Sequence, residues 1–248
     1  MPKGNILGVY LDVIDRNGLH QAIGSSVAGG GRDVYAYANI HAINLAQQFP
    51  RVKSFFNSAH VVYCDGEGVR LGARLLGFAL PPRVVLTYWV WELCALCVER
   101  GYSVYFLGAH DDVIRLAAGN AARRFPQLKI KGWHHGYFEK QGPENETVIR
   151  TIHDAAPDIL LVGFGMPVQE DWIEMNRARL NVHAILPAGS LFDYMAGTKS
   201  IAPEWMANHG LEWLYRLMQE PGRLWKRYLI GNPLFFIRVL LQAIRGWE

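Results

Sequence analysis

The sequence has little cysteine, little charge and no long apolar run. Three cysteines in 248 residues are too few for a disulfide framework, so a reducing cytoplasm is the expected compartment. Charged residues make up 19% of the chain, which argues against long disordered tails, and a net charge of +3 is too small to indicate a nucleic-acid partner. No apolar segment is long enough and sufficiently free of charge to span a bilayer. Asp12 interrupts the N-terminal segment before a signal-peptide core develops, so no signal peptide is expected.

What the sequence does contain is an alternation of short apolar runs and longer amphipathic segments. The apolar runs predict strands near 6–9, 33–38, 61–63, 103–107, 128–130, 159–163 and 184–186. The amphipathic segments predict helices near 18–28, 39–48, 67–76, 87–100, 111–124, 144–155 and 167–178. Strands that are apolar on both faces belong to sheets covered on both sides. The pattern therefore predicts an α/β fold, with a mostly parallel, doubly wound sheet between two layers of helices.

The alternation stops near residue 200, which predicts a core of residues 1–200 and a helical appendage of residues 201–248. Pro221 and the segment 231–233 are expected to break the end of the chain into two short helices. A narrow polar stripe runs along the otherwise apolar second helix: Arg238, Gln242 and Arg245. We expect this helix to lie in a membrane interface, with its cations toward anionic headgroups. The alternative is that its apolar face packs on the protein's own core.

Asp65 is the first candidate for chemistry, because it follows a predicted strand and precedes Gly66. Glycine lets the backbone turn tightly and approach a ligand, and a partly desolvated carboxylate at a strand end can act as a base. Two other interpretations stay open at this point. Asp65 could cap the following helix. With Glu67 it could also form a two-carboxylate motif that holds a metal–nucleotide complex, and the pair Asp111 and Asp112 is a second candidate for such a motif.

Three further loops bring glycine to the ends of predicted strands, where ligands bind in parallel α/β sheets. Gly108 precedes a helix start, and free N–H groups at helix starts bind phosphate, although a plain turn would look the same. In the segment 160–173 the candidates are Gly163, Gly165, Pro167, Gln169 and Glu170. Gln169 offers a donor and an acceptor that could read sugar hydroxyls or uracil, unless it is merely exposed. The third loop holds Gly189 and Asp193, and together the loops would complete a pocket.

Two pairs of potential metal ligands fit a structural role better. Cys94 and Cys97 lie in the middle of an apolar helical segment, without the second pair or the helix N-terminus that a zinc or redox site needs. His134 and His135 follow Trp133 in a predicted loop without a partner pattern. No metal and no cofactor are predicted.

Several blocks of the sequence carry a resemblance to a known family. In chain order they are ILGV, YANIHAIN around Asn39, CDGEGV, FLGAHDDV, IKGWHHGYF, DILLVGFGMPVQEDWI, GSLFDYMAG and APEWMANHGLEWLYRLMQEPGRLWKRY. The P-x-Q-E-x-W and E-W-L-x-R-L-x-x-E-P-x-R patterns within them are specific. Together the blocks, which cover most of the chain, resemble the WecG/TagA/CpsF family of bacterial glycosyltransferases.

The resemblance implies a Rossmann-like core with a C-terminal helical appendage, and an inverting, metal-independent enzyme. Such an enzyme transfers a sugar from a UDP-sugar donor to a polyprenyl-diphosphate-linked saccharide. It acts as a peripheral protein on the anionic inner face of the bacterial cell membrane, in the synthesis of a cell-surface polysaccharide such as an exopolysaccharide. By the same resemblance Asp65 is the catalytic base, and Asn39 and Gln169 position the reacting groups. The basic residues that meet diphosphate would come from the appendage: Arg216, Arg223, Lys226 and Arg227.

One position departs from the family pattern, because Tyr37 stands where a threonine is usual. Its bulk would reshape the pocket, so the transferred sugar is expected to be N-acetylmannosamine, its uronic acid or glucose.

An oligomer is possible. The main alternative is an inactive, membrane-associated nucleotide-binding or scaffold protein of the same fold. A dinucleotide-dependent reductase is disfavoured, because the sequence lacks the G-x-G-x-x-G fingerprint.

Overall fold

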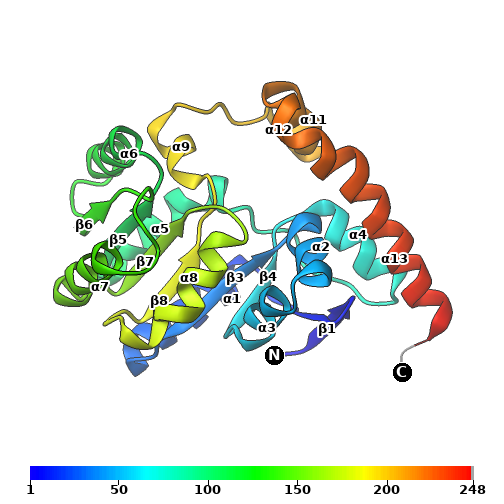
Figure 1. The fold of residues 1–248 in the computed structure, drawn as a ribbon, viewed down its shortest axis with the longest axis horizontal. Coiled ribbons are helices and arrows are strands. Elements are labelled where there is room, and N and C mark those ends of the chain that lie inside the picture. The colour runs from blue at the N-terminus through cyan, green and yellow to red at the C-terminus, as the bar shows by residue number, and fades with distance from the viewer. Residues whose placement is uncertain (247–248) are drawn as a thin grey trace.

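In the computed structural model, which describes residues 1–246, six parallel strands form one sheet in the order β4-β3-β8-β7-β5-β6 (Figure 1). The strands are β3 (Asp33–Ala38), β4 (Val61–Cys64), β5 (Ser103–Gly108), β6 (Lys129–His134), β7 (Ile159–Gly163) and β8 (Ala184–Pro187). The strands β4, β5, β7 and β8 are buried along their whole length. The predicted α/β fold with its parallel sheet is confirmed.

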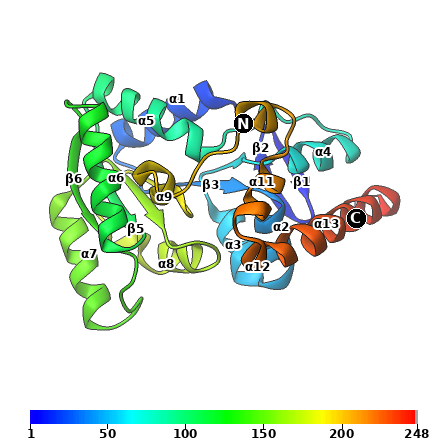
Figure 2. The same cartoon turned by 90° about the horizontal axis from the view of Figure 1, so that it is seen from above.

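Helices cover both faces of this sheet, as the view from above shows (Figure 2). One core holds side chains of α1 (Arg16–Gly29), α5 (Leu86–Arg100), α6 (Asp111–Arg124) and α9 (Leu191–Ala196). The other holds side chains of α2 (Ile40–Gln48), α3 (Pro50–Ser58), α4 (Glu67–Leu75), α7 (Pro143–Ala155) and α8 (Val168–Asn176). A short 3₁₀ turn, η1 (Arg177–Arg179), follows α8. Because the sheet is apolar on both sides, both layers are needed to remove it from water.

The predicted strand at 6–9 is wrong, since its centre is a turn. Leu7 and Gly8 have positive φ and join β1 (Lys3–Ile6) to β2 (Val9–Asp12) in an antiparallel hairpin. This hairpin forms a separate two-stranded sheet. The buried Asp12 ties it to the main sheet, because its Oδ2 accepts a hydrogen bond of 2.9 Å from the backbone of Val62. Helix α3 was not predicted from the sequence.

The segment beyond residue 200 is helical, with α10 (Glu204–Asn208), α11 (Glu212–Gln219) and α12 (Pro221–Trp225). The predicted break at 231–233 is wrong. A π-helical segment, η2 (Lys226–Ile230), connects α12 directly to α13 (Gly231–Arg245). Pro233 has no backbone N–H to donate within a regular helix. The wider π turn before it accommodates the missing hydrogen bond, so the chain stays helical through the proline. Figure 1 shows the resulting long helical segment along one side of the molecule.

Helix α13 packs on the core with the face that carries its polar residues. Arg238 donates to Asn44 at 3.1 Å, and Gln242 accepts from the backbone of Leu7 at 2.8 Å. Phe235 and Val239 are fully buried on the same helix. The polar stripe is therefore not turned toward membrane headgroups as predicted, because Arg238 and Gln242 are bonded to the core.

The opposite side of this C-terminal segment is exposed and apolar. The exposed side chains from η2 and α13 are Leu229, Ile230, Ile237, Leu240, Leu241 and Ile244, the last with 79% of its area accessible. Among the described residues, the helices are all too short or too polar to cross a membrane.

Candidate active site

Two cavities of about 390 and 420 Å³ meet at Asp65, on the edge of the sheet where the parallel strands end. The first lies between α4, α11 and α13. The second lies over the loops that follow β5, β7 and β8. Both are lined by Asn39, Asp65, Arg216 and Arg227. Two ligands could thus lie on either side of one carboxylate.

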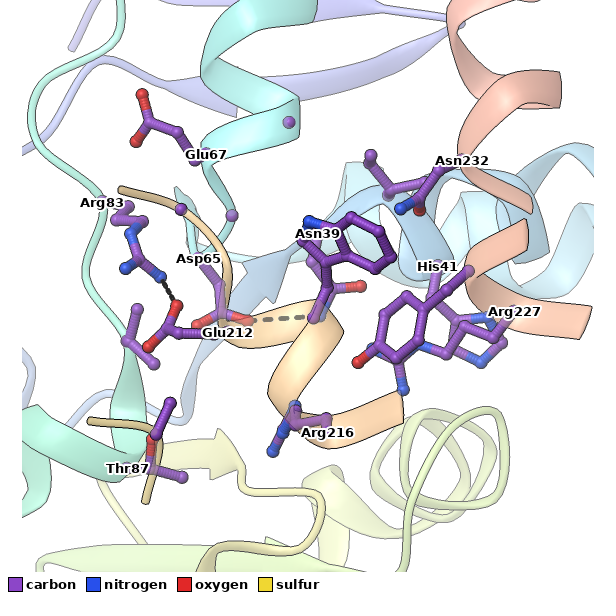
Figure 3. A pocket seen from close by; sticks show the side chains of 18 of the residues that line it. Asn39, His41, Asp65, Glu67, Arg83, Thr87, Glu212, Arg216, Arg227 and Asn232 are labelled. Atoms are coloured by element: carbon purple, nitrogen blue, oxygen red, sulfur yellow. Dashed lines mark hydrogen bonds and ion pairs between the residues drawn. The ribbon is translucent and has the colours of Figure 1, made fainter. Parts of the chain in front are cut away.

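Asp65 is held beside Asn39 because their strands are neighbours in the sheet. β3 and β4 pair in parallel, and the Asp65 N–H extends this pairing by donating to Ala38 O at 3.0 Å. Asn39 then caps α2 with its Oδ1, while its Nδ2 donates to Asp65 Oδ2 at 3.2 Å (Figure 3). The N-cap of α4 is Gly66, so the interpretation of Asp65 as a helix cap is wrong.

The surroundings of Asp65 make its carboxylate a stronger base than usual. Burial raises its pKa, and the hydrogen bond from Asn39 and the charge of Arg216 only partly oppose this. The carboxylate of Glu212 raises the pKa further, while Arg83 lowers it. A carboxylate with a raised pKa is better matched to proton transfer near neutral pH.

The C-terminal helices complete the first cavity. Arg83, in the loop after α4, forms an ion pair with Glu212 on α11 and donates to Ala207 O at 3.0 Å. Arg216 on α11 donates to Tyr194 OH at 2.9 Å and lines both cavities. Figure 3 shows the Arg83–Glu212 pair and Arg216 around Asp65. Arg83 and Glu212, which are 129 positions apart in the chain, therefore share this wall.

Gln169 is fully buried, and its amide joins β3, α8 and the loops that follow β7 and β8. Its Oε1 accepts from the backbone N–H groups of Gly165 at 3.2 Å and Gly189 at 2.9 Å. Its Nε2 donates to Tyr37 OH at 3.3 Å and to Glu170 Oε1 at 2.8 Å. All four partners are protein atoms, so the interpretation of Gln169 as merely exposed is wrong. In this arrangement it fixes Tyr37 and the glycine loops.

Glu170 is a buried carboxyl group within this network. Burial raises its pKa to about 7, against a hydrogen bond from Gln169 that lowers it. Among the described residues, no donor reaches its Oε2. Pro167, expected to open the helix, precedes α8 by one residue.

The glycine loops let two strand ends come unusually close together. Gly108 has φ of +153°, and a Cβ built on it would lie 2.3 Å from the carbonyl oxygen of Gly163. The neighbouring Ala109 N–H donates to the same oxygen at 3.3 Å. Gly163, Gly165 and Gly189 all line the second cavity, and so does Asp193, which pairs with Lys199 at 3.8 Å.

Three of the four predicted cations reach the cavities. Arg216 and Arg227 line both, and Arg223 lines the second, where it pairs with Glu220. Burial lowers the pKa of Arg227. Lys226 instead stands exposed, with its Nζ 5.5 Å from the centroid of the Trp225 ring. Lys226 and its neighbour Arg227 therefore face different surroundings.

Aromatic and basic side chains that the sequence did not single out form the far wall of the second cavity. Tyr137, which lines the cavity, stacks on His110 with ring centroids 3.8 Å apart. Lys140 also lines it and lies 4.4 Å from the centroid of the Phe164 ring. His41 and Arg83 were missed as well. Neither lies in a local sequence pattern that would have indicated a site.

The candidate metal ligands are not brought together. Glu67 pairs with Arg70 at 2.8 Å and Asp111 with Arg115 at 2.5 Å. Across residues 1–246, no three His, Cys, Asp or Glu side chains form a group that could hold a metal ion. Cys94 and Cys97 are buried in α5, as expected for structural cysteines.

Comparison with known proteins agrees with this architecture. Residues 4–248 match the family described as the glycosyl transferase WecG/TagA/CpsF family. The chain therefore belongs to this family, and it is a glycosyltransferase. It is 28% identical over 233 residues to N-acetylglucosaminyldiphosphoundecaprenol N-acetyl-beta-D-mannosaminyltransferase of Bacillus subtilis (strain 168), which covers 94% of this chain and 86% of the relative. The enzyme of the same name from Staphylococcus aureus (strain MW2) is 28% identical over 204 residues, covering 82% and 77%.

Proposed function

We propose that the protein transfers a sugar from a UDP-sugar to a polyprenyl-diphosphate-linked saccharide, with inversion and without a metal ion. The observation that carries this proposal is the meeting of two cavities at Asp65. A group-transfer enzyme needs its donor and acceptor on opposite sides of the reacting atoms. The names of both relatives favour N-acetylmannosamine as the sugar and N-acetylglucosaminyl-diphosphate lipid as the acceptor.

The second cavity suits the donor. The stacked Tyr137 offers an aromatic face for a uracil ring, and the loops at Gly163, Gly165 and Gly189 leave room for a ligand against the backbone. Arg216, Arg223 and Arg227 lie on its Asp65 side, where they would stabilise the negative charge that develops on departing UDP.

The first cavity then takes the acceptor. Asp65 Oδ removes the proton from the acceptor hydroxyl as its oxygen bonds to the anomeric carbon. The bond from that carbon to the UDP oxygen breaks on the opposite face, so the configuration inverts. Asn39 donates to Asp65 and keeps the carboxylate in place. We propose that residues 201–248 act as an appendage that closes this cavity over the acceptor.

Replacing the base tests this mechanism. Asp65→Asn should lower turnover of UDP-N-acetylmannosamine with an N-acetylglucosaminyl-diphosphate lipid analogue by at least about a hundredfold, the effect of a lost general base. UDP binding, measured by calorimetry, should change little. Asp154→Asn, on the exposed side of α7, is the control. Near-normal turnover in Asp65→Asn would contradict the proposed role, and absence of turnover in the wild type with any UDP-sugar would favour the non-catalytic alternative.

We also propose that the exposed apolar face of η2 and α13 rests on the inner face of the cell membrane, where the lipid-linked acceptor is found. Ile237, Leu241 and Ile244 lie on this face with about half or more of their area accessible. An interfacial helix binds through buried apolar area. Replacing all three with serine should abolish flotation with anionic liposomes. Equal flotation of variant and wild type would refute this membrane contact.

A further inference from the structure

The cavity beside Asp65 does not end at polar side chains. Its lining continues from Asp65 and Arg83 to Ile40, Leu71 and Phe236, at the junction of α4 and α13. Here the phenylalanine rings of α13 pack against the glycine backbone of α4. A Cβ built on Gly72 would lie 2.8 Å from the Phe235 ring, and one on Gly68 would lie 3.9 Å from the Phe236 ring.

Beyond this junction both helices present apolar residues one turn apart. Leu71 and Leu75 on α4 are 47% and 43% exposed, and Leu240, one turn after Phe236 on α13, is 47% exposed. Residues four apart lie on the same helix face. Leu71 and Phe236 line the cavity, and Leu75 and Leu240 continue the same two helix faces, so the two pairs define an apolar path from the cavity toward the surface. We call it the α4–α13 groove.

The charge along this path is graded. The inner end holds the cations Arg83, Arg216 and Arg227 with the carboxylates Asp65 and Glu212, and Leu71 and Phe236 make the outer end apolar. An amphipathic ligand with an anionic head and a hydrocarbon tail complements both ends at once. Leu71 on α4 and Phe236 on α13 both line the cavity, so an apolar tail can leave it between these two helices.

We propose that the α4–α13 groove binds the first isoprene units of the acceptor's prenyl chain. This rests on the proposed function for the identity of the ligand, and it goes further by placing the chain within the protein. The enzyme then recognises its acceptor by the lipid next to the diphosphate as well as by the sugar. The bound chain also fixes the direction from which the acceptor hydroxyl approaches Asp65.

Binding of prenyl diphosphates tests the groove without any sugar transfer. Dimethylallyl, geranyl and farnesyl diphosphate carry one, two and three isoprene units and stay monomeric at low concentration. In calorimetry without membrane or detergent, the Kd should fall by about tenfold or more from one unit to three, as expected when apolar carbons leave water. A Kd that does not depend on chain length would overturn the proposal.

Leu71→Gln locates the effect. It keeps helix propensity at a half-exposed position, so the fold is maintained. The variant should raise the Kd for farnesyl diphosphate about fivefold or more and leave that for dimethylallyl diphosphate within about twofold. Leu116→Gln is the matched control, because Leu116 on α6 is 46% exposed and lies far from the groove. If Leu71→Gln binds farnesyl diphosphate as the control does, the tail lies elsewhere. If the proposed function is wrong but the groove is real, farnesyl diphosphate should still bind tightly while sugar transfer to the lipid-linked acceptor is absent.

Discussion

Truncating Phe235 tests how the C-terminal helix is held on the core. The side chain is fully buried, and its ring packs directly on the backbone of α4 at Gly72. Removing a buried phenylalanine side chain costs about 3–5 kcal/mol, because transfer free energy is lost and a cavity remains. We expect Phe235→Ala to lower the free energy of unfolding, or of local release of α13, by an amount in this range. Ile237→Ala, on the exposed side of the same helix, should change it by less than about 0.5 kcal/mol.

A second substitution at the same contact sharpens this expectation. Gly72→Ala places a methyl group 2.8 Å from the Phe235 ring, and overpacking of this kind costs about 1–3 kcal/mol. Alanine is otherwise favoured over glycine within a helix by about 0.5–1 kcal/mol. In the Phe235→Ala background the methyl group enters vacated space, so Gly72→Ala should become stabilising there. The two substitutions should therefore couple strongly.

The assay combines urea unfolding, followed by circular dichroism, with the rate of tryptic cleavage at the basic residues of 223–227. If α13 is released locally, cleavage should accelerate even where the global transition moves little. If Phe235→Ala matches Ile237→Ala in both measurements, Phe235 does not hold α13 on the core. If Gly72→Ala has the same effect with and without Phe235→Ala, the two residues are not in contact.

Three further outcomes are expected. Gly108→Ala should destabilise the fold by more than about 1 kcal/mol in urea unfolding, because its Cβ would meet Gly163 O at 2.3 Å, whereas Gly119→Ala in open space on α6 should be neutral or stabilising. Glu170 has a pKa raised by burial to about 7 from its usual 4.5, so the folded state binds its proton more tightly than the unfolded state. The free energy of unfolding of the wild type should therefore fall as the pH rises from 4.5 to about 7, and Glu170→Gln should make it depend less on pH. An equal pH dependence in wild type and variant would contradict the burial argument. EDTA should leave turnover largely intact, and a loss that Mn²⁺ or Mg²⁺ restores would place a metal at the carboxylates instead.

The regular part of the fold could be predicted because it depends on local pattern. Apolar runs of strand length between amphipathic segments gave six strands of the parallel sheet close to their observed positions. The hairpin at Leu7–Gly8 was missed because two non-standard backbone conformations lie inside an apolar run, where periodicity does not reveal a turn. The proline in the last helix was taken as a break, but the π-helical η2 accommodates it, and the packing of Phe235 and Val239 holds that segment in place.

The site was predicted in part for the same reason. Asp65, Asn39 and the glycine loops follow strands, and the carboxyl ends of parallel strands meet at one edge by construction. The surroundings of Gln169 could not be predicted, because its four hydrogen-bond partners come from β3, from α8 and from the loops after β7 and β8. Arg83 and Glu212 are 129 positions apart, and they meet only because α11 folds back over the loop after α4.

By itself, then, the sequence determined the α/β class and the sheet edge at which Asp65, Asn39 and the glycine loops gather, since both depend on short-range spacing and on the geometry of parallel strands. Only the tertiary structure decided that two cavities meet at Asp65, that Arg238 and Gln242 face the core, and that Leu71 of α4 and Phe236 of α13 line one cavity. The physical reason is that an amphipathic pattern specifies which residues of a helix share a face, whereas the choice of the buried face depends on packing against distant segments. In α13 that choice was made by the fit of Phe235 on Gly72, a contact between residues 163 positions apart.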